Sequence, residues 1–177
     1  EISLGKKYHA QVLQQTPSYK DQELQDYVQG IGDSLSIKSH RPNLFYRFTV
    51  LDSPEINAFA LPGGYIYINR GLMAYLSSEE ELAAVLGHEI GHVTARHSVR
   101  QYSQSQLLGI LSTAVQMNSG RTAGDIVGVA SGALLAGYGR EMELEADELG
   151  AEYIYQDGYS TDGMMSVLSV LKNQEIY

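Results

Sequence analysis

The sequence predicts an α+β fold that is mainly helical and carries one small sheet of about three strands. Apolar residues recur at helical spacing in the first and last parts of the chain, whereas residues 44–69 are rich in aromatic and β-branched side chains. At 177 residues the chain can bury a single core, and neither a linker nor an internal repeat divides it. We therefore expect a single domain over residues 1–177.

Composition excludes several classes of function. A formal net charge of -9 argues against nucleic-acid binding, which requires a basic surface. The absence of cysteine excludes disulfides, cysteine-ligated zinc and a thiol nucleophile. The longest apolar candidate, Ile126–Tyr138, is shorter than the ~20 residues of a membrane span. We expect no nucleic-acid partner and no transmembrane span in this chain.

The first part of the chain, about residues 1–38, is expected to be helical. One helix over about Ile2–Gln15 ends before Pro17, because proline disfavours helical backbone at the residue before it. A second helix, from Asp21 to about Ser36, has apolar residues every three or four positions.

Residues 44–69 are expected to form the sheet and a hairpin. One strand is predicted from Leu44 to Leu51. Two more, Ile56–Ala60 and Tyr65–Asn69, flank the turn sequence Leu61-Pro62-Gly63-Gly64, which is typical of a hairpin.

The longest predicted helix covers about residues 78–104. Ser77 or Ser78 can cap its start, and a glutamate follows three residues later, as in a capping box. A further helix is expected at about residues 140–157, ended by Gly158.

The segment Gln106–Gly139 lies between these two helices and is rich in small residues. It predicts two loosely specified helices around a mobile loop. These either pack closely through their small side chains or form a plug over a site.

His88 and His92 are four residues apart in the longest predicted helix. At this spacing both imidazoles lie on one side of a helix, one turn apart, so both can reach one metal ion. Glu89, on the flank of the same helix, can take a proton from a metal-bound water. The pattern indicates a catalytic zinc site, which needs a third protein ligand.

The acidic run Glu141–Glu148 is the expected source of the third ligand. Glu143 fits this role well, because Asp147 lies one turn away and can accept the second N–H of a zinc-bound histidine. Glu141 remains an alternative, and Glu145 points to nearly the opposite side of the helix, where a solvated position suits it.

The remaining histidines are not expected to bind the metal. His97 is five residues past His92, so helical spacing turns it away from the ion, towards the surface or a second layer. His9 and His40 have no recognisable ligand context and are expected to be solvated.

Three separated motifs resemble those of a known family. These are residues 57–64 (NAFALPGG), 88–92 (HEIGH) and 143–150 (ELEADELG). Their order and sequence resemble the zinc metallopeptidases (HExxH gluzincins) that include HtpX, the CAAX prenyl proteases and the soluble, periplasmic BepA-like branch.

The resemblance implies a site around one Zn²⁺ ion. It assigns His88, His92 and Glu143 as ligands, in preference to the other glutamates of the acidic run. Glu89 is the implied general base, and Asp147 the implied support of a histidine ligand. The implied fold is zincin-like, with the hairpin beside the catalytic helix.

The same resemblance implies how a substrate is held. The strand Tyr65, Ile66, Tyr67, Ile68 and Asn69 is expected at the edge of the cleft, where an extended peptide could pair with it. Some relatives supply a late histidine to the oxyanion, but no histidine follows His97 here, which leaves Tyr138 and Arg140 as candidates.

The implied activity is that of a zinc-dependent endopeptidase acting on polypeptides in envelope protein quality control. The implied location is the bacterial periplasm or cell envelope, with a signal peptide removed. A helical-repeat or other partner region is expected outside these 177 residues. The alternative is a latent peptidase that acts mainly as a chaperone-like assembly or binding module.

Overall fold

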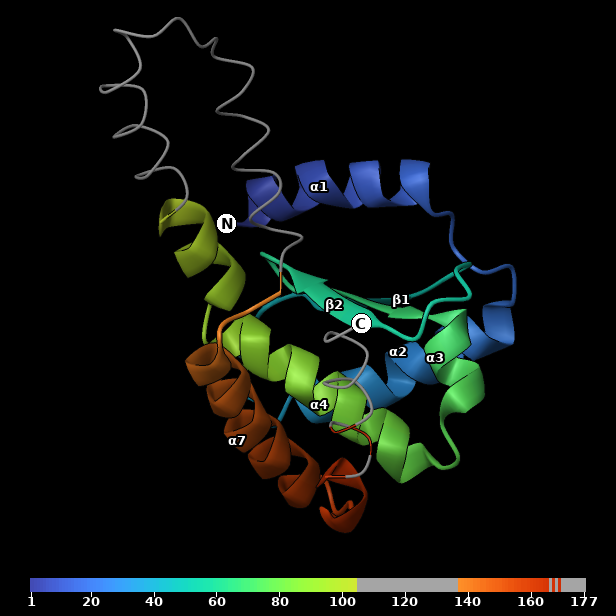
Figure 1. Ribbon diagram of the computed structural model, residues 1–177, viewed down its shortest axis with the longest axis vertical. Coiled ribbons are helices and arrows are strands. Elements are labelled where there is room, and N and C mark those ends of the chain that lie inside the picture. Colours follow the sequence, from blue (N-terminus) through green and yellow to red (C-terminus); the bar gives the residue numbers. More distant parts are fainter. Residues whose placement is uncertain (105–136, 166, 168, 170–177) are drawn as a thin grey trace, which may run out of the picture.

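The computed structural model describes residues 1–104, 137–165, 167 and 169. The helices in this part of the chain include α1 (Ile2–Gln15), α2 (Gln22–Ser36), α3 (Arg70–Tyr75), α4 (Glu79–Thr94) and α7 (Arg140–Gln156). A three-stranded sheet lies between α1 on one face and α2 with α4 on the other (Figure 1). α7 packs against α4 and α2. The expected mainly helical α+β fold is confirmed.

The sheet consists of β1 (Arg47–Leu51), β2 (Ala58–Leu61) and β3 (Tyr65–Asn69) in the order β1-β3-β2. β2 and β3 form the expected antiparallel hairpin, and its turn places Gly63 and Gly64 at φ values of 88° and 96°. Glycine suits both positions, because side chains with a Cβ rarely adopt positive φ.

The prediction that Tyr65–Asn69 is an edge strand is wrong. β3 is the central strand, because β1 pairs in parallel with its other side. Its backbone is therefore occupied on both sides, and β2 is the edge strand of the hairpin. The hairpin pattern was visible in the sequence, but the side on which the first strand adds is decided by tertiary packing.

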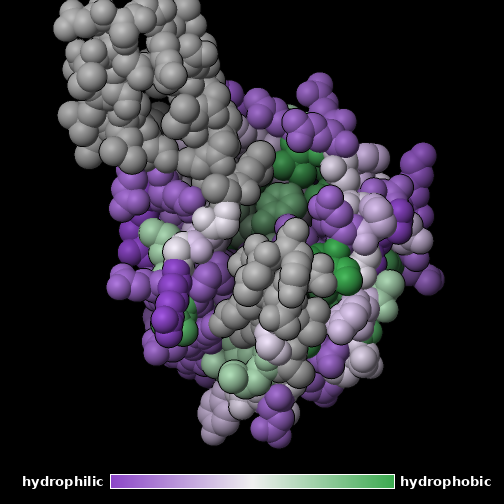
Figure 2. Space-filling model, in the orientation of Figure 1, coloured by the Kyte–Doolittle hydropathy of each residue, from purple (hydrophilic) through white to green (hydrophobic). Residues whose placement is uncertain are grey.

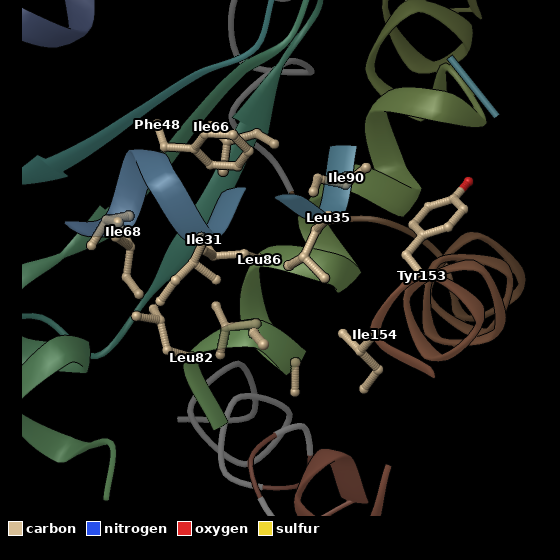
Figure 3. Packing of buried hydrophobic residues seen from close by; sticks show 14 of the residues in the cluster. Ile31, Leu35, Phe48, Ile66, Ile68, Leu82, Leu86, Ile90, Tyr153 and Ile154 are labelled. Atoms are coloured by element: carbon tan, nitrogen blue, oxygen red, sulfur yellow. The ribbon is translucent and has the colours of Figure 1, made fainter. Parts of the chain in front are cut away.

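The main core lies between the sheet and the pair α2 and α4 (Figure 3). The side chains that meet there come from α2, the sheet, α4 and α7: Ile31, Leu35, Phe48, Ile66, Ile68, Leu82, Leu86, Ile90, Tyr153 and Ile154. Alternate residues of β3 point the other way, so Tyr67 packs with Tyr8 of α1 in a second, smaller cluster.

The helix predicted over residues 78–104 is interrupted. α4 begins after Ser78, whose side chain accepts a hydrogen bond from the Glu81 N–H, and it ends at Thr94. Arg96 then adopts a φ of 55°, which an α-helix cannot accommodate. Residues 97–104 start a new helical segment in a different direction.

Among the residues that Figure 2 colours by hydropathy, most are hydrophilic, and the hydrophobic ones form small patches. In the part of the chain that the structure describes, no helix has the length and apolar character required to cross a membrane. The two helices expected between residues 106 and 139 lie almost wholly outside the described residues.

Candidate metal centre

The two histidines of the HEIGH motif lie in a continuously buried stretch of α4. Every residue of α4 from Leu82 to Val93 is buried. His88 and His92 are only 5 % and 2 % exposed, and their Nε2 atoms are 3.1 Å apart. The four-residue spacing therefore brings the two imidazole nitrogens close together, as expected from the sequence.

α7 reaches this point because glycines allow two helices to approach closely. A Cβ added at Gly91 would lie 2.8 Å from the Ala146 carbonyl oxygen, and one at Gly150 would lie 2.8 Å from the His88 backbone nitrogen. Such distances are shorter than side-chain contacts allow, so larger residues would separate α4 from α7. The close approach brings Glu143 of α7 to the two histidines.

The Glu143 carboxylate completes a set of three metal-ligand groups. Its oxygens lie 3.0 Å from His88 Nε2 and 3.3 Å from His92 Nε2. Tetrahedral zinc with bonds of about 2.0–2.2 Å separates its ligand atoms by roughly 3.4 Å. The observed separations come close to this value, and two imidazoles with one carboxylate are a common donor set for catalytic zinc. The residues present therefore fit a zinc ion.

The protonation states of the three clustered side chains are set by burial and by their contacts with one another. Burial acts to lower the pKa of His88, but hydrogen bonds with Asp147 and Glu143 outweigh it and raise that pKa to about 10. Burial acts to raise the pKa of Glu143, and its two histidine partners nevertheless hold it well below its usual range. Burial lowers the pKa of His92 to about 4, so this imidazole is neutral at neutral pH.

Asp147 lies where the sequence predicted a partner for a zinc-bound histidine. Its Oδ1 is 2.8 Å from His88 Nδ1, an ion-pair contact that favours a proton on this nitrogen. The other nitrogen, Nε2, is thereby turned towards Glu143 and His92. This arrangement is typical of metal-ligating histidines.

The structure also brings His97 to the site, against the expectation from helical spacing. His97 is fully buried, and its Nδ1 lies 2.7 Å from His92 Nδ1. The prediction failed because it continued a straight helix through Arg96, where the backbone turns. Of the two expected places, the second layer is correct. No glycine or proline marks this turn in the sequence.

Glu145 is partly exposed, as expected, but it is not merely solvated. Its Oε2 lies 2.9 Å from His97 Nε2 and 3.1 Å from the Arg100 guanidinium. Nothing in the local pattern of α7 distinguishes it from the other exposed glutamates, because both of its partners come from beyond the end of α4.

His9 and His40 take no part in this cluster. His9 is partly buried rather than solvated, since its Nδ1 lies 2.5 Å from the Tyr67 hydroxyl and its ring stacks on Tyr65. His40 is exposed, as predicted, and its Nδ1 lies 2.7 Å from the Tyr153 hydroxyl.

Three further candidates differ in their positions. Glu89 is only 4 % exposed, and its charge contributes to raising the pKa of the adjacent His88. Tyr138 stacks its ring on His92, with centroids 4.1 Å apart, and its hydroxyl bonds the Ser98 hydroxyl. Arg140 is exposed at the start of α7. Glu89 and Tyr138 are therefore close to the histidines of the cluster, and Arg140 is on the surface.

The chain is similar to several known peptidases. Residues 20–176 match peptidase family M48. The whole chain is 30% identical to 38% of the beta-barrel assembly-enhancing protease of Yersinia pestis. Over 70% of its length the chain is 30% identical to the metalloprotease YcaL of Escherichia coli (strain K12), and the match covers 50% of that protein. Over 68% it is 33% identical to 24% of the mitochondrial metalloendopeptidase OMA1 of Arabidopsis thaliana.

These matches agree with the geometry of the cluster on α4 and α7. The chain spans about two fifths of the length of the assembly-enhancing proteases that it matches. The expected resemblance to metallopeptidases of the BepA-like branch is confirmed. Because the family match covers most of the sequence, including His88, His92 and Glu143, this chain belongs to peptidase family M48.

Proposed function

We propose that this chain is a zinc-dependent endopeptidase that hydrolyses peptide bonds with a metal-activated water. The observation that carries the proposal is the convergence of His88, His92 and Glu143 beside a buried carboxylate. A zinc ion bound there would lower the pKa of its water towards ~7 and polarise a peptide carbonyl.

Glu89 is the proposed general base. It is buried next to His88 on α4, and it is not one of the three residues whose ligand atoms converge. Its carboxylate takes a proton from the attacking water and passes it to the amine that leaves. Tyr138 is the better placed of the two oxyanion candidates, and burial raises its pKa, so its hydroxyl remains a hydrogen-bond donor at neutral pH.

An extended polypeptide is the proposed substrate, and β2 is the proposed strand that pairs with it. β2 is an edge of the sheet and packs against α4, which carries the catalytic residues. Edge strands present unpaired backbone groups that can bind a peptide in extended form. The proposal therefore moves the pairing from Tyr65–Asn69 to Ala58–Leu61.

We place this activity in the bacterial periplasm or cell envelope, on unfolded or unassembled envelope proteins. The support is the similarity to proteases named for enhancing beta-barrel assembly. Partner-binding regions of the helical-repeat kind belong, in this proposal, to sequence outside these 177 residues.

The test is the substitution Glu89→Gln in zinc-loaded protein. Loss of the base should lower kcat on an unfolded protein substrate by about 10²–10⁴-fold. Bound zinc, measured by elemental analysis, should stay stoichiometric, because Glu89 is not a ligand. Wild-type cleavage should stop when a chelator is added. Unchanged cleavage by Glu89→Gln would contradict the assignment of the base.

A latent peptidase that works as a chaperone-like binding module is the alternative. One observation favours it: the Tyr138 ring lies flat against His92 and covers one side of this ligand. This alternative predicts that zinc-loaded wild-type protein leaves an unfolded substrate intact. It also predicts that Glu89→Gln restores function to cells that lack the protein, whereas the peptidase proposal predicts no rescue.

A further inference from the structure

His97 is a buried polar residue to which the proposed mechanism gives no role. Its side chain is 0 % exposed, and it lies between a metal ligand and a surface carboxylate. We infer that His97 and Glu145 are positioning residues, which fix the tautomer and the orientation of the ligand His92. This inference rests on the proposed metal site.

Three distances define a chain of contacts from the surface to the ligand. Glu145 Oε2 lies 2.9 Å from His97 Nε2, and His97 Nδ1 lies 2.7 Å from His92 Nδ1. His92 Nε2 then lies 3.3 Å from Glu143 Oε1. At each of the first two contacts the atoms are close enough for a hydrogen bond.

The carboxylate at the outer end determines where each proton lies. An ionised carboxylate only accepts hydrogen bonds, so His97 Nε2 must carry a proton and donate it to Glu145. In the neutral imidazole the other nitrogen, Nδ1, then has a lone pair and accepts from the His92 Nδ1–H. His92 Nε2 is left with its lone pair directed at the metal position.

The opposite assignment is unfavourable at both ends. If His97 Nδ1 donated to His92, the His97 Nε2 lone pair would face the Glu145 carboxylate. The His92 proton would then lie on Nε2, where a metal ion has to bind. Glu145 therefore selects the tautomer of His92 through His97, although it does not touch His92.

The surroundings hold the two positioning residues in place. The Arg100 guanidinium lies 3.1 Å from the same Glu145 oxygen, which anchors the carboxylate. The Tyr138 ring stacks on His92 and lies 5.8 Å from the His97 ring, measured between centroids, so it shields both imidazoles on that side. The turn at Arg96 directs His97 back towards α4.

The two ligand histidines are thus oriented by carboxylates in different ways. Asp147 pairs directly with His88 Nδ1, whereas Glu145 acts on His92 through one intervening imidazole. Partners of metal-bound histidines affect metal affinity, typically by 10–100-fold. A buried histidine that served only to fill space could affect zinc affinity only through packing, and to the same extent in two variants of the same shape.

The test compares zinc dissociation constants of the wild type with those of His97→Leu, His97→Asn and Glu145→Ala. Leucine and asparagine have nearly the same shape, but only asparagine has a side-chain oxygen that can accept from His92. We expect His97→Leu to weaken zinc binding by about 10–100-fold, and His97→Asn to recover most of that loss. The control His9→Leu, at a histidine that contacts Tyr67, should bind zinc as the wild type does.

A second readout uses the metal-free protein and does not depend on activity. In wild type, ¹H–¹⁵N spectra of the imidazoles should show His92 as the Nδ1–H tautomer. In Glu145→Ala, which changes only a partly exposed side chain, part of the population should move to the Nε2–H form.

The outcomes separate this inference from the proposed function. If the wild type binds no zinc, the assignment of the metal site is wrong, and the positioning role is overturned as well. If the wild type binds zinc and the His97 variants and Glu145→Ala bind it equally well, the metal site stands and the positioning role is overturned. Equal losses in His97→Leu and His97→Asn would also overturn it, because packing rather than hydrogen bonding would then be the cause.

Discussion

α4 and α7 both carry metal-site residues, but the two helices are buried to very different degrees. α4 is buried continuously from Leu82 to Val93. α7 buries only one strip, made by Ala146, Gly150, Tyr153 and Ile154. The two histidines on α4 are therefore enclosed by buried neighbours along the same helix. Glu143 on α7 is held in place by the contact of one strip with α4.

This difference separates local from tertiary control of the site. The two histidines on α4 would keep their mutual spacing in any α-helix, because the helix itself sets it. The Glu143 carboxylate reaches them only while α7 lies close to Gly87 and Gly91. We therefore expect exposed residues of α7 that contact no histidine of the site, such as Glu141, to tolerate change, and the strip facing α4 to transmit change to the metal position.

The largest expected effect comes from removing the ligand of α7. Glu143→Ala should weaken zinc binding by more than about 100-fold, since it deletes a direct ligand rather than a supporting partner. Glu141→Ala, at an exposed position of the same helix, should leave the zinc dissociation constant unchanged. A stoichiometric zinc content in Glu143→Ala at low micromolar zinc, measured by elemental analysis, would contradict the ligand assignment.

Sequence reasoning succeeded for this site where the signal was local. The spacing of His88 and His92 needs only one helix, and the capping box at Ser78 marks where that helix begins. The residue expected to be the third ligand, Glu143, belongs to an acidic run and has an aspartate one turn away, and the structure brings it to the histidines.

The features that sequence reasoning missed all depend on contacts between distant segments. The place of β3 in the middle of the sheet follows from its pairing with β1. The position of His97 depends on a turn at Arg96, and arginine is not a residue type that indicates a positive φ. Glu145 looks like any exposed glutamate until residues 97–104 are packed beside α7.

The close approach of the two helices can be tested with matched glycine substitutions. In Gly150→Ala the new Cβ would lie 2.8 Å from the His88 backbone nitrogen and 2.9 Å from the Gly87 carbonyl carbon. Both are backbone atoms, so the helices must separate. We expect the free energy of unfolding to fall by about 1–3 kcal/mol relative to the control.

The control is Gly30→Ala in α2, where a new Cβ meets nothing within 4 Å. Alanine there should raise the free energy of unfolding by about 0.5–1 kcal/mol, because it lowers the conformational entropy of the unfolded chain. Urea denaturation of both variants measures the difference. Equal stability of the two would show that α4 and α7 can separate without cost, and the distinction between the helices would fail.

The smallest expected effect is the number of protons released when zinc binds, which distinguishes the two histidines of α4. Both nitrogens of His88 face carboxylates, which raise its pKa to about 10, whereas burial lowers the pKa of His92 to about 4. In the metal-free protein, stabilisation by protonated His88 is complete below its unfolded pKa of about 6.5 and is lost as the pH rises through about 10.

Zinc binds only the deprotonated nitrogen, so it must displace the His88 proton at any pH below about 10. Zinc affinity should therefore rise by about tenfold per pH unit, and calorimetry in buffers of different ionisation enthalpy should detect about one proton released per zinc. A measurement near pH 6 avoids the proton of a zinc-bound water, whose pKa is about 7. Release of no proton would mean that His88 is already neutral, and release of two would mean that His92 is also protonated. Either result would remove the difference that burial and carboxylate contacts create between two histidines only one helical turn apart.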